Sequence, residues 1–207
     1  GYHFIDAEMV SLDFSDRILI TQGDGLEIKV AESGFAVEPG PDNLVSQAME
    51  LIGEKAFIRI DKKIPSGAGL GGGSTNAAAV LRQFGFDDPV QASSIGADVA
   101  YCLIGGRARV SGIGEVIEPL PFLEKTFTLL IPPIGVSTPE VYKHWDEMGG
   151  PAGESGNDLE PALLSCMPEM IQYKNRLAAI SGKEPQLAGS GGTWFVEGEF
   201  FLRATAT

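Results

Sequence analysis

The sequence predicts a mixed α+β fold in which strands dominate the first part of the chain and helices the last part. Segments of alternating apolar and polar residues, the pattern of half-buried strands, recur between residues 8 and 131. Apolar residues at helical spacing prevail from residue 139 onward. No series of strand–helix–strand units follows the glycine-rich segment near residue 70, so a doubly wound parallel sheet is not expected.

The strands are predicted from alternation and from the residues that bound them. Residues 26–30 alternate strictly, as a half-buried strand does, and the apolar run at 127–131 is stopped by Pro132 and Pro133. Strands are expected at residues 8–20 (as strand, turn and strand), 26–30, 56–61, 107–117 (as a hairpin), 127–131 and 192–196.

The helices are predicted from apolar spacing and from residues that suit helix ends. Asp42 and Asn43 offer an N-cap to the first helix, and residues 74–76 (Ser-Thr-Asn) offer one to the second, which Gly85 ends. Helices are expected at residues 44–52, 77–83, 93–103, 139–145, 158–165 and 168–180. The glycine-containing segment 147–157 is expected to be a linker or a mobile loop.

Composition limits the classes of partner. The 207 residues suit one large domain or two small ones that share a core. A net charge of −13 disfavours broad binding to nucleic acid or to an anionic membrane, because such binding needs basic patches. Backbone N–H groups and a metal ion can still hold a small phosphorylated ligand. No apolar run reaches the roughly 18 residues that span a bilayer, and two cysteines are too few for a disulfide framework, so we expect a cytoplasmic protein with reduced thiols.

The most informative segment is a glycine-rich loop at residues 65–76, Pro-Ser-Gly-Ala-Gly-Leu-Gly-Gly-Gly-Ser-Thr-Asn. Glycines let the backbone turn its N–H groups inward and leave no Cβ to block a polyphosphate. The helix expected after Ser74 adds the positive end of its dipole at the same point. The hydroxyl of Ser74 or Thr75 could bind phosphate oxygens or help to hold Mg²⁺. The loop therefore predicts an anion site, although a plain flexible turn would have similar composition.

Two better-known glycine motifs fit this loop poorly. Gly67, Gly69 and Gly72 satisfy G-x-G-x-x-G, and acidic residues follow at 87 and 88, as in dinucleotide-binding folds. The loop follows Lys-Lys-Ile-Pro at 62–65 rather than an apolar strand, however, and no further βαβ units come after it. A P-loop needs Lys before the Ser/Thr, where this chain has Gly73.

Residues 65–78 resemble the central ATP-binding motif of the GHMP kinases, a superfamily that includes galactokinase, homoserine kinase and mevalonate kinase. Three glycines followed by Ser/Thr-Asn-Ala resemble most specifically its branch acting on 4-diphosphocytidyl-2-C-methyl-D-erythritol. Further matching segments stand in the family's order, at residues 1–3, 12–16, 42–44, 96–99, 112–115, 136–139, 157–160 and 187–192. The resemblance covers nearly the whole chain.

The resemblance implies a two-lobed α+β GHMP kinase fold. Residues 1–120 would form an ATP-binding lobe like domain 2 of ribosomal protein S5, and residues 121–207 an α/β sandwich. It also implies that the γ-phosphoryl group of ATP passes, with Mg²⁺, to the 2-hydroxyl of the cytidine diphosphate substrate, in the non-mevalonate isoprenoid pathway. The implied partners are these small molecules, with no nucleic acid and no membrane, and the protein would be a monomer or a homodimer. The metal ligands are left unassigned.

The resemblance also assigns site residues. Asp98, in the Gly-Ala-Asp-Val segment, would accept the hydroxyl proton or orient the nucleophile. ATP would be bound by Pro65, Gly67, Gly69, Leu70, Gly71, Gly72, Gly73, Ser74, Thr75 and Asn76. The substrate would be bound by Tyr2, His3, Asp98, Thr138, Tyr142, Gly189, Ser190 and Gly191, with the aromatic residues against the cytosine.

The chain departs from the family pattern at identifiable places. The family carries a Lys and an Asn on a strand before Gly-Tyr-His, and neither Lys62 nor Lys63 matches that Lys. The segment 83–93 is shorter than the family's by about a helix, and Ala100 stands where Pro is common. Two alternatives therefore stay open: another GHMP kinase, of mevalonate, homoserine or sugar type, and a non-catalytic nucleotide-binding homologue.

Overall fold

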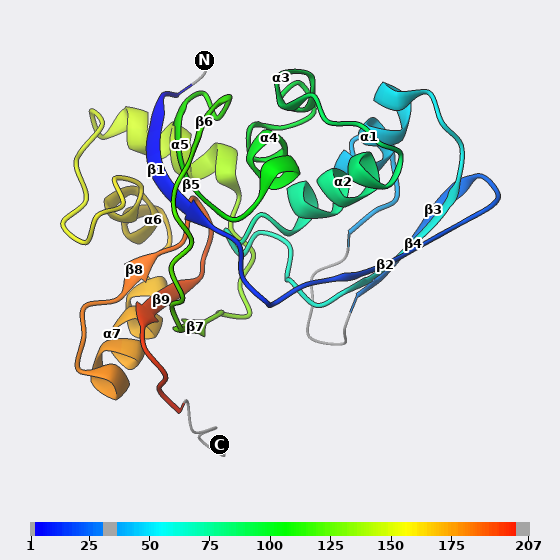
Figure 1. The fold of residues 1–207 in the computed structure, drawn as a ribbon. Coiled ribbons are helices and arrows are strands. Elements are labelled where there is room, and N and C mark those ends of the chain that lie inside the picture. The colour runs from blue at the N-terminus through cyan, green and yellow to red at the C-terminus, as the bar shows by residue number, and fades with distance from the viewer. Residues whose placement is uncertain (1–2, 31–36, 202–207) are drawn as a thin grey trace. The chain divides into compact units, whose positions relative to one another are not determined.

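The computed structural model describes residues 3–30 and 37–201, which form two compact units. The first unit comprises Gly1–Ser66 and Gly71–Leu123, and the second comprises Gly67–Leu70 and Glu124–Thr207. The tip of the glycine loop therefore groups with the C-terminal part of the chain. Both units combine helices with small sheets (Figure 1), so the predicted α+β class is confirmed.

Among its described residues, the first unit contains two three-stranded sheets. In one, β1 (Ile5–Val10) pairs antiparallel with β5 (Arg107–Gly112), which pairs antiparallel with β6 (Val116–Pro119). In the other, β4 (Phe57–Lys62) lies between β2 (Arg17–Thr21), which is antiparallel to it, and β3 (Gly25–Val30), which is parallel. Ile58 and Ile60 of β4 are fully buried, as a central strand with alternating side chains requires.

The described part of the first unit also contains four helices: α1 (Leu44–Ile52), α2 (Gly72–Gln83), α3 (Pro89–Ala92) and α4 (Ala97–Ile104). Figure 1 shows α2 with α1 and α4 as its neighbours, and α2 contacts both of them. Their shared core is rich in small side chains, which allow helices to approach closely. This core consists of Ala48, Ala77, Ala78, Leu81, Ala92, Val99 and Leu103.

The second unit, as far as residue 201, has one sheet and three helices. Strand β9 (Trp194–Glu197) lies between β7 (Phe127–Leu130) and β8 (Gln186–Leu187), and both pairings are antiparallel. The helices are α5 (Thr138–Glu147), α6 (Glu160–Cys166) and α7 (Met170–Ser181). Trp194, Leu163, Met170 and Leu177 are the large, fully buried side chains at the centre of this unit.

Most expected elements are confirmed to within a few residues, and Asn43 caps α1 by accepting a hydrogen bond from the Val45 N–H at 3.0 Å. The expectation that residues 74–76 cap the second helix is wrong. Helix α2 begins at Gly72, after Gly71 in the left-handed conformation (φ 62°), so these three residues lie inside the helix. Their polar side chains form tertiary contacts instead, as described below.

The helix expected at 93–103 is also wrong at its start. The Ser93 and Ser94 hydroxyls donate to the carbonyls of Val90 and Gln91, at the end of α3. Gly96 then takes an extended conformation, and α4 begins at Ala97. Strand β8 was not predicted, since two residues carry no periodic signal. Within the described residues, no helix is both long enough and apolar enough to cross a bilayer.

Candidate active site

The glycine loop alternates between left-handed and ordinary backbone conformations. Gly67, Gly69 and Gly71 have φ values of 70°, 76° and 62°, and no described non-glycine residue, including Ala68 and Leu70, has a positive φ. Alternation of this kind turns successive N–H groups toward one side and forms a concavity that suits an anion. A side chain at these three positions would be strained, so the loop needs glycine there.

Helix α2 begins at Gly72, within the glycine-rich segment 65–76 and directly after its left-handed glycines, and has no side-chain cap. The first N–H groups of a helix have no partner within the helix, and here no side chain takes that place. Gly72 and Gly73 provide the first turn without any Cβ. The helix start thus offers free donors and the positive end of the helix dipole to a phosphate group.

The side chains that follow point into the first unit. Ser74 is buried, the Thr75 hydroxyl lies 3.4 Å from the Cys102 sulfur on α4, and the Asn76 amide donates to Asp16 at 2.8 Å. These contacts explain why none of the three residues caps the helix. Burial raises the pKa of the Cys102 thiol to about 11, so Cys102 stays protonated and neutral beside Thr75 at neutral pH.

Asp98 lies in the first turn of α4, one turn before Cys102. Burial raises the pKa of its carboxyl group above the usual Asp range. In the described part of the chain, no side chain donates a hydrogen bond to this carboxylate or forms an ion pair with it. Burial of a carboxylate that has no partner lowers the stability of the folded protein, and such groups cluster at functional sites. Asp98 is therefore a functional candidate on physical grounds.

In the second unit, the loop tip packs against the glycine turn at residues 188–192. A Cβ placed on Gly69 would overlap the Ala188 carbonyl oxygen, and one placed on Gly191 would overlap the backbone of Ala68 and Gly69. The Thr193 N–H also donates to the Ala68 carbonyl at 3.1 Å. The two glycine motifs, which are far apart in sequence, are thus packed backbone against backbone.

Four of the predicted substrate residues of the second unit lie at the same turn: Thr138, Gly189, Ser190 and Gly191. The hydroxyls of Thr138, the first residue of α5, and Ser190 are 2.7 Å apart, and Ser190 stands between Gly189 and Gly191. Tyr142, one helical turn after Thr138, is partly buried and packs against the core of this unit. His3 is half-buried in the first unit, and Tyr2 lies outside the described residues.

Asn157 has a role that sequence reasoning missed. Its amide donates to the carbonyls of Leu187 at 2.9 Å and Gly189 at 2.8 Å, while its oxygen accepts from the Leu159 N–H at 2.9 Å. The side chain therefore holds the backbone of the second glycine turn. The only signal in the sequence was its position in the matching segment 157–160, which names no partner.

Asn157→Asp is expected to destabilise this turn. The carboxylate would face two carbonyl oxygens, so both hydrogen bonds would become repulsive contacts, at a cost of about 1–3 kcal/mol. Thermal unfolding by circular dichroism measures the loss. Asn175→Asp, at an exposed position of α7, is the matched control and should leave the melting temperature nearly unchanged. Equal melting temperatures for both variants would contradict the role of Asn157.

The chain is similar to known proteins in both sequence and structure. Residues 43–106 match the family model described as the GHMP kinases N terminal domain. A 4-diphosphocytidyl-2-C-methyl-D-erythritol kinase of Paracoccus denitrificans is 34% identical over 217 residues, covering 94% of this chain and 78% of that protein. The enzyme of the same name from Geobacillus kaustophilus is also 34% identical, covering 94% and 80%.

Solved structures agree with the sequence matches. A crystal structure of 4-(cytidine 5'-diphospho)-2C-methyl-D-erythritol kinase superposes with a TM-score of 0.73 at 28% identity, covering 94% of this chain and 81% of that one. A homoserine kinase from Cytophaga hutchinsonii superposes with a TM-score of 0.54 at 18% identity, which indicates a shared fold only.

Proposed function

The chain belongs to the 4-diphosphocytidyl-2-C-methyl-D-erythritol kinase family of GHMP kinases, and on this basis we propose that it transfers the γ-phosphoryl group of ATP to the 2-hydroxyl of that substrate. The observation that carries the proposal is the identity of 34% across 94% of the chain. The local geometry supports it independently, because a glycine loop and an uncapped helix start suit a polyphosphate.

The ATP phosphates are proposed to lie against the glycine loop and the first turn of α2. The ATP-binding residues are those of the loop and of that turn, namely Pro65, Gly67, Gly69, Leu70, Gly71, Gly72, Gly73, Ser74, Thr75 and Asn76. The side chains of Ser74 and Asn76 are buried, so these two residues support the phosphate site from the interior of the protein. Residues 1–120 are assigned to the ATP-binding lobe and residues 121–207 to the C-terminal lobe. Phosphoryl transfer depends mainly on positioning and charge stabilisation, which this arrangement supplies through backbone donors.

Asp98 is proposed to act on the nucleophile. Its carboxylate accepts the proton of the substrate 2-hydroxyl as the oxygen bonds to the γ-phosphorus and the bridging bond to the β-phosphate breaks, releasing ADP. The pKa raised by burial makes this carboxylate a stronger base than an exposed Asp. The group must still be ionised to accept the proton.

The remaining substrate contacts are assigned to Tyr2, His3, Thr138, Tyr142, Gly189, Ser190 and Gly191. The paired hydroxyls of Thr138 and Ser190 offer donors and acceptors at the second glycine turn. Mg²⁺ neutralises charge on the phosphates when it is bound. Among the described residues, no group of three His, Cys, Asp or Glu side chains could hold a metal ion. In kinase sites Mg²⁺ is held largely by the substrate phosphates, with one or two carboxylates.

The proposal is tested by incubating the full-length protein with ATP, Mg²⁺ and 4-diphosphocytidyl-2-C-methyl-D-erythritol and measuring ADP. Parallel reactions with mevalonate, homoserine and galactose test the other possible phosphoryl acceptors under the same conditions. ADP formation with the cytidine diphosphate substrate alone is the expected result. Preference for another acceptor would overturn the substrate assignment, and no turnover with any acceptor would favour a non-catalytic homologue.

The variant Gly73→Ala tests phosphate binding without destabilising the fold. Gly73 is not left-handed, and a Cβ there would meet only the Leu44 side chain at 3.5 Å, an ordinary contact. Alanine favours helix over glycine by about 0.5–1 kcal/mol, so the variant should be at least as stable as the parent. If phosphates lie against this backbone, the KM for ATP should rise about tenfold, which corresponds to about 1.4 kcal/mol.

Steady-state kinetics and thermal unfolding of the same preparation check this prediction. Gly40→Ala is the control, since Gly40 is not left-handed and a Cβ there would meet open space. It should change neither stability nor the KM for ATP. An unchanged KM for ATP in Gly73→Ala would place the phosphates elsewhere.

A further inference from the structure

Asp16 is a buried carboxylate next to the start of the glycine loop, outside the set of residues assigned above. It stands just before β2, with its side chain 1% exposed, and pairs with Lys62, whose side chain is 5% exposed, at 2.6 Å. Buried charges of this kind are rare unless every polar atom is satisfied. The pair therefore needs an explanation.

Asp16 accepts four hydrogen bonds. One oxygen accepts from the backbone N–H groups of Lys63 at 2.7 Å and Ile64 at 2.8 Å. The other accepts from the Lys62 ammonium at 2.6 Å and the Asn76 amide at 2.8 Å. Burial alone would raise the pKa of this carboxyl, but the four donors outweigh it and the pKa is lowered. Asp16 is thus ionised at neutral pH.

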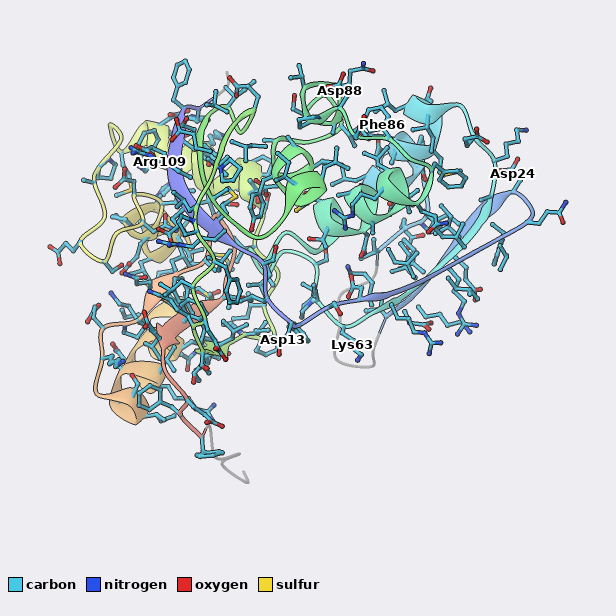
Figure 2. The ribbon with its side chains drawn as sticks, viewed as in Figure 1. Asp13, Asp24, Lys63, Phe86, Asp88 and Arg109 are labelled. Carbon is cyan, nitrogen blue, oxygen red and sulfur yellow. The ribbon has the colours of Figure 1, made fainter. Side chains whose placement is uncertain are left out.

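These four donors lie on both sides of the glycine loop. Lys62 ends β4, Lys63 and Ile64 lead into the loop (Lys63 is labelled in Figure 2), and Asn76 is in α2, just after the loop. A single carboxylate therefore joins the two ends of the phosphate-binding segment within the first unit. The Ile64 side chain also occupies the space that a Cβ on Gly72 would need, at 2.8 Å, so the two ends touch.

A gain in the stability of the folded protein does not by itself explain such a buried network. Buried ion pairs can often be replaced by apolar side chains of similar shape at no cost in stability. Apolar side chains could not accept hydrogen bonds from the Lys63 and Ile64 N–H groups, however, and so could not fix the backbone that enters the loop. Errors of about 1 Å in the placement of reacting groups cost about 100-fold in rate.

We propose that Asp16 is a positioning residue for ATP, which fixes both ends of the glycine loop through Lys62, the backbone of residues 63–64 and Asn76. The inference rests on the proposed function, because it assigns the loop to the phosphates of ATP. It extends that function to a residue that contacts no substrate. Asp16 acts on the loop alone, so its loss should affect ATP and leave the second substrate's binding unchanged.

The test is Asp16→Asn, which keeps the shape of the side chain. Its amide nitrogen would face the donors of Lys62 or Asn76, so two of the four hydrogen bonds fail. The KM for ATP should rise about 10- to 100-fold, with the KM for the second substrate unchanged. Asp6→Asn is the matched control, since Asp6 also forms an ion pair at 2.6 Å, with Arg109 and with a side chain that is 59% exposed. It should change no kinetic constant.

Lys62→Gln provides a second variant in case Asp16→Asn does not fold. Lys62→Gln leaves Asp16 three of its four hydrogen-bond donors. Its KM for ATP is therefore expected to lie between the values for the parent and for Asp16→Asn. An unchanged KM for ATP in a folded variant of either residue, while the parent protein turns over, would refute the positioning role. Absence of turnover in the parent would refute the proposed function instead.

Discussion

Asp98→Asn is expected to lower kcat about 10²- to 10⁴-fold while nucleotide binding is retained. The amide keeps the size of the side chain but cannot accept the hydroxyl proton. ATP is proposed to lie on the glycine loop and α2, and Asp98 lies on α4, so loss of the carboxylate does not remove a phosphate contact. Steady-state kinetics gives kcat, and titration with a fluorescent ATP analogue gives nucleotide affinity.

The same substitution is expected to keep or increase stability at neutral pH. Burial raises the pKa of Asp98 in the folded protein, so the folded state binds more protons than the unfolded state between the unfolded and folded pKa values. The contribution of Asp98 to the free energy of unfolding therefore falls as the pH rises through that window, and the cost is fully present above it. Asn carries no charge and removes this cost.

The pH dependence of both quantities checks the assignment. In the parent protein, kcat/KM should fall as the pH drops through the raised pKa, and the stability advantage of Asp98→Asn should shrink over the same range. Asp87→Asn, an exposed carboxylate in the same unit, should change neither quantity. Unchanged activity of Asp98→Asn would remove Asp98 from the mechanism.

Features that depend on neighbouring residues could be predicted from the sequence. Asn43 caps α1 through a bond to the residue two positions later, and Pro132 stands two residues after the end of β7. The alternation of β4 between buried and half-buried side chains was likewise visible in the order of its residues. The α+β class follows from such local signals taken together.

Features that depend on distant residues could not be predicted. Asn76 looked like a helix cap because its amide suits that role, but its partner Asp16 is 60 positions away. The Asn157 amide finds the Leu187 carbonyl 30 positions away. Both side chains have several possible partners within the sequence, and only the fold selects one. The glycine loop could be recognised as a motif, whereas the residues that hold it in place could not.

Gly191→Ala is expected to disrupt the second glycine turn and the loop tip together. A Cβ at Gly191 would overlap the nitrogen of Gly69 and the carbonyl carbon of Ala68, which are backbone atoms and cannot rotate away. The φ of Gly191 is not left-handed, so the damage comes from overlap and not from backbone strain. Overpacking of this kind costs about 1–3 kcal/mol and occasionally more. Any displacement of the loop tip should also lower the turnover of ATP about 100-fold.

Gly192→Ala is a demanding control, because it changes the next residue in the same turn. A Cβ there would meet the ends of two side chains, the Met170 methyl at 3.0 Å and a Val136 methyl at 3.1 Å. Methionine is flexible and can yield, so the loss in melting temperature should be clearly smaller than in Gly191→Ala. Thermal unfolding and ADP formation, measured well below both melting temperatures, distinguish the two variants. Equal losses in both would mean that the close backbone packing of Gly69 and Gly191 does not set the shape of the loop.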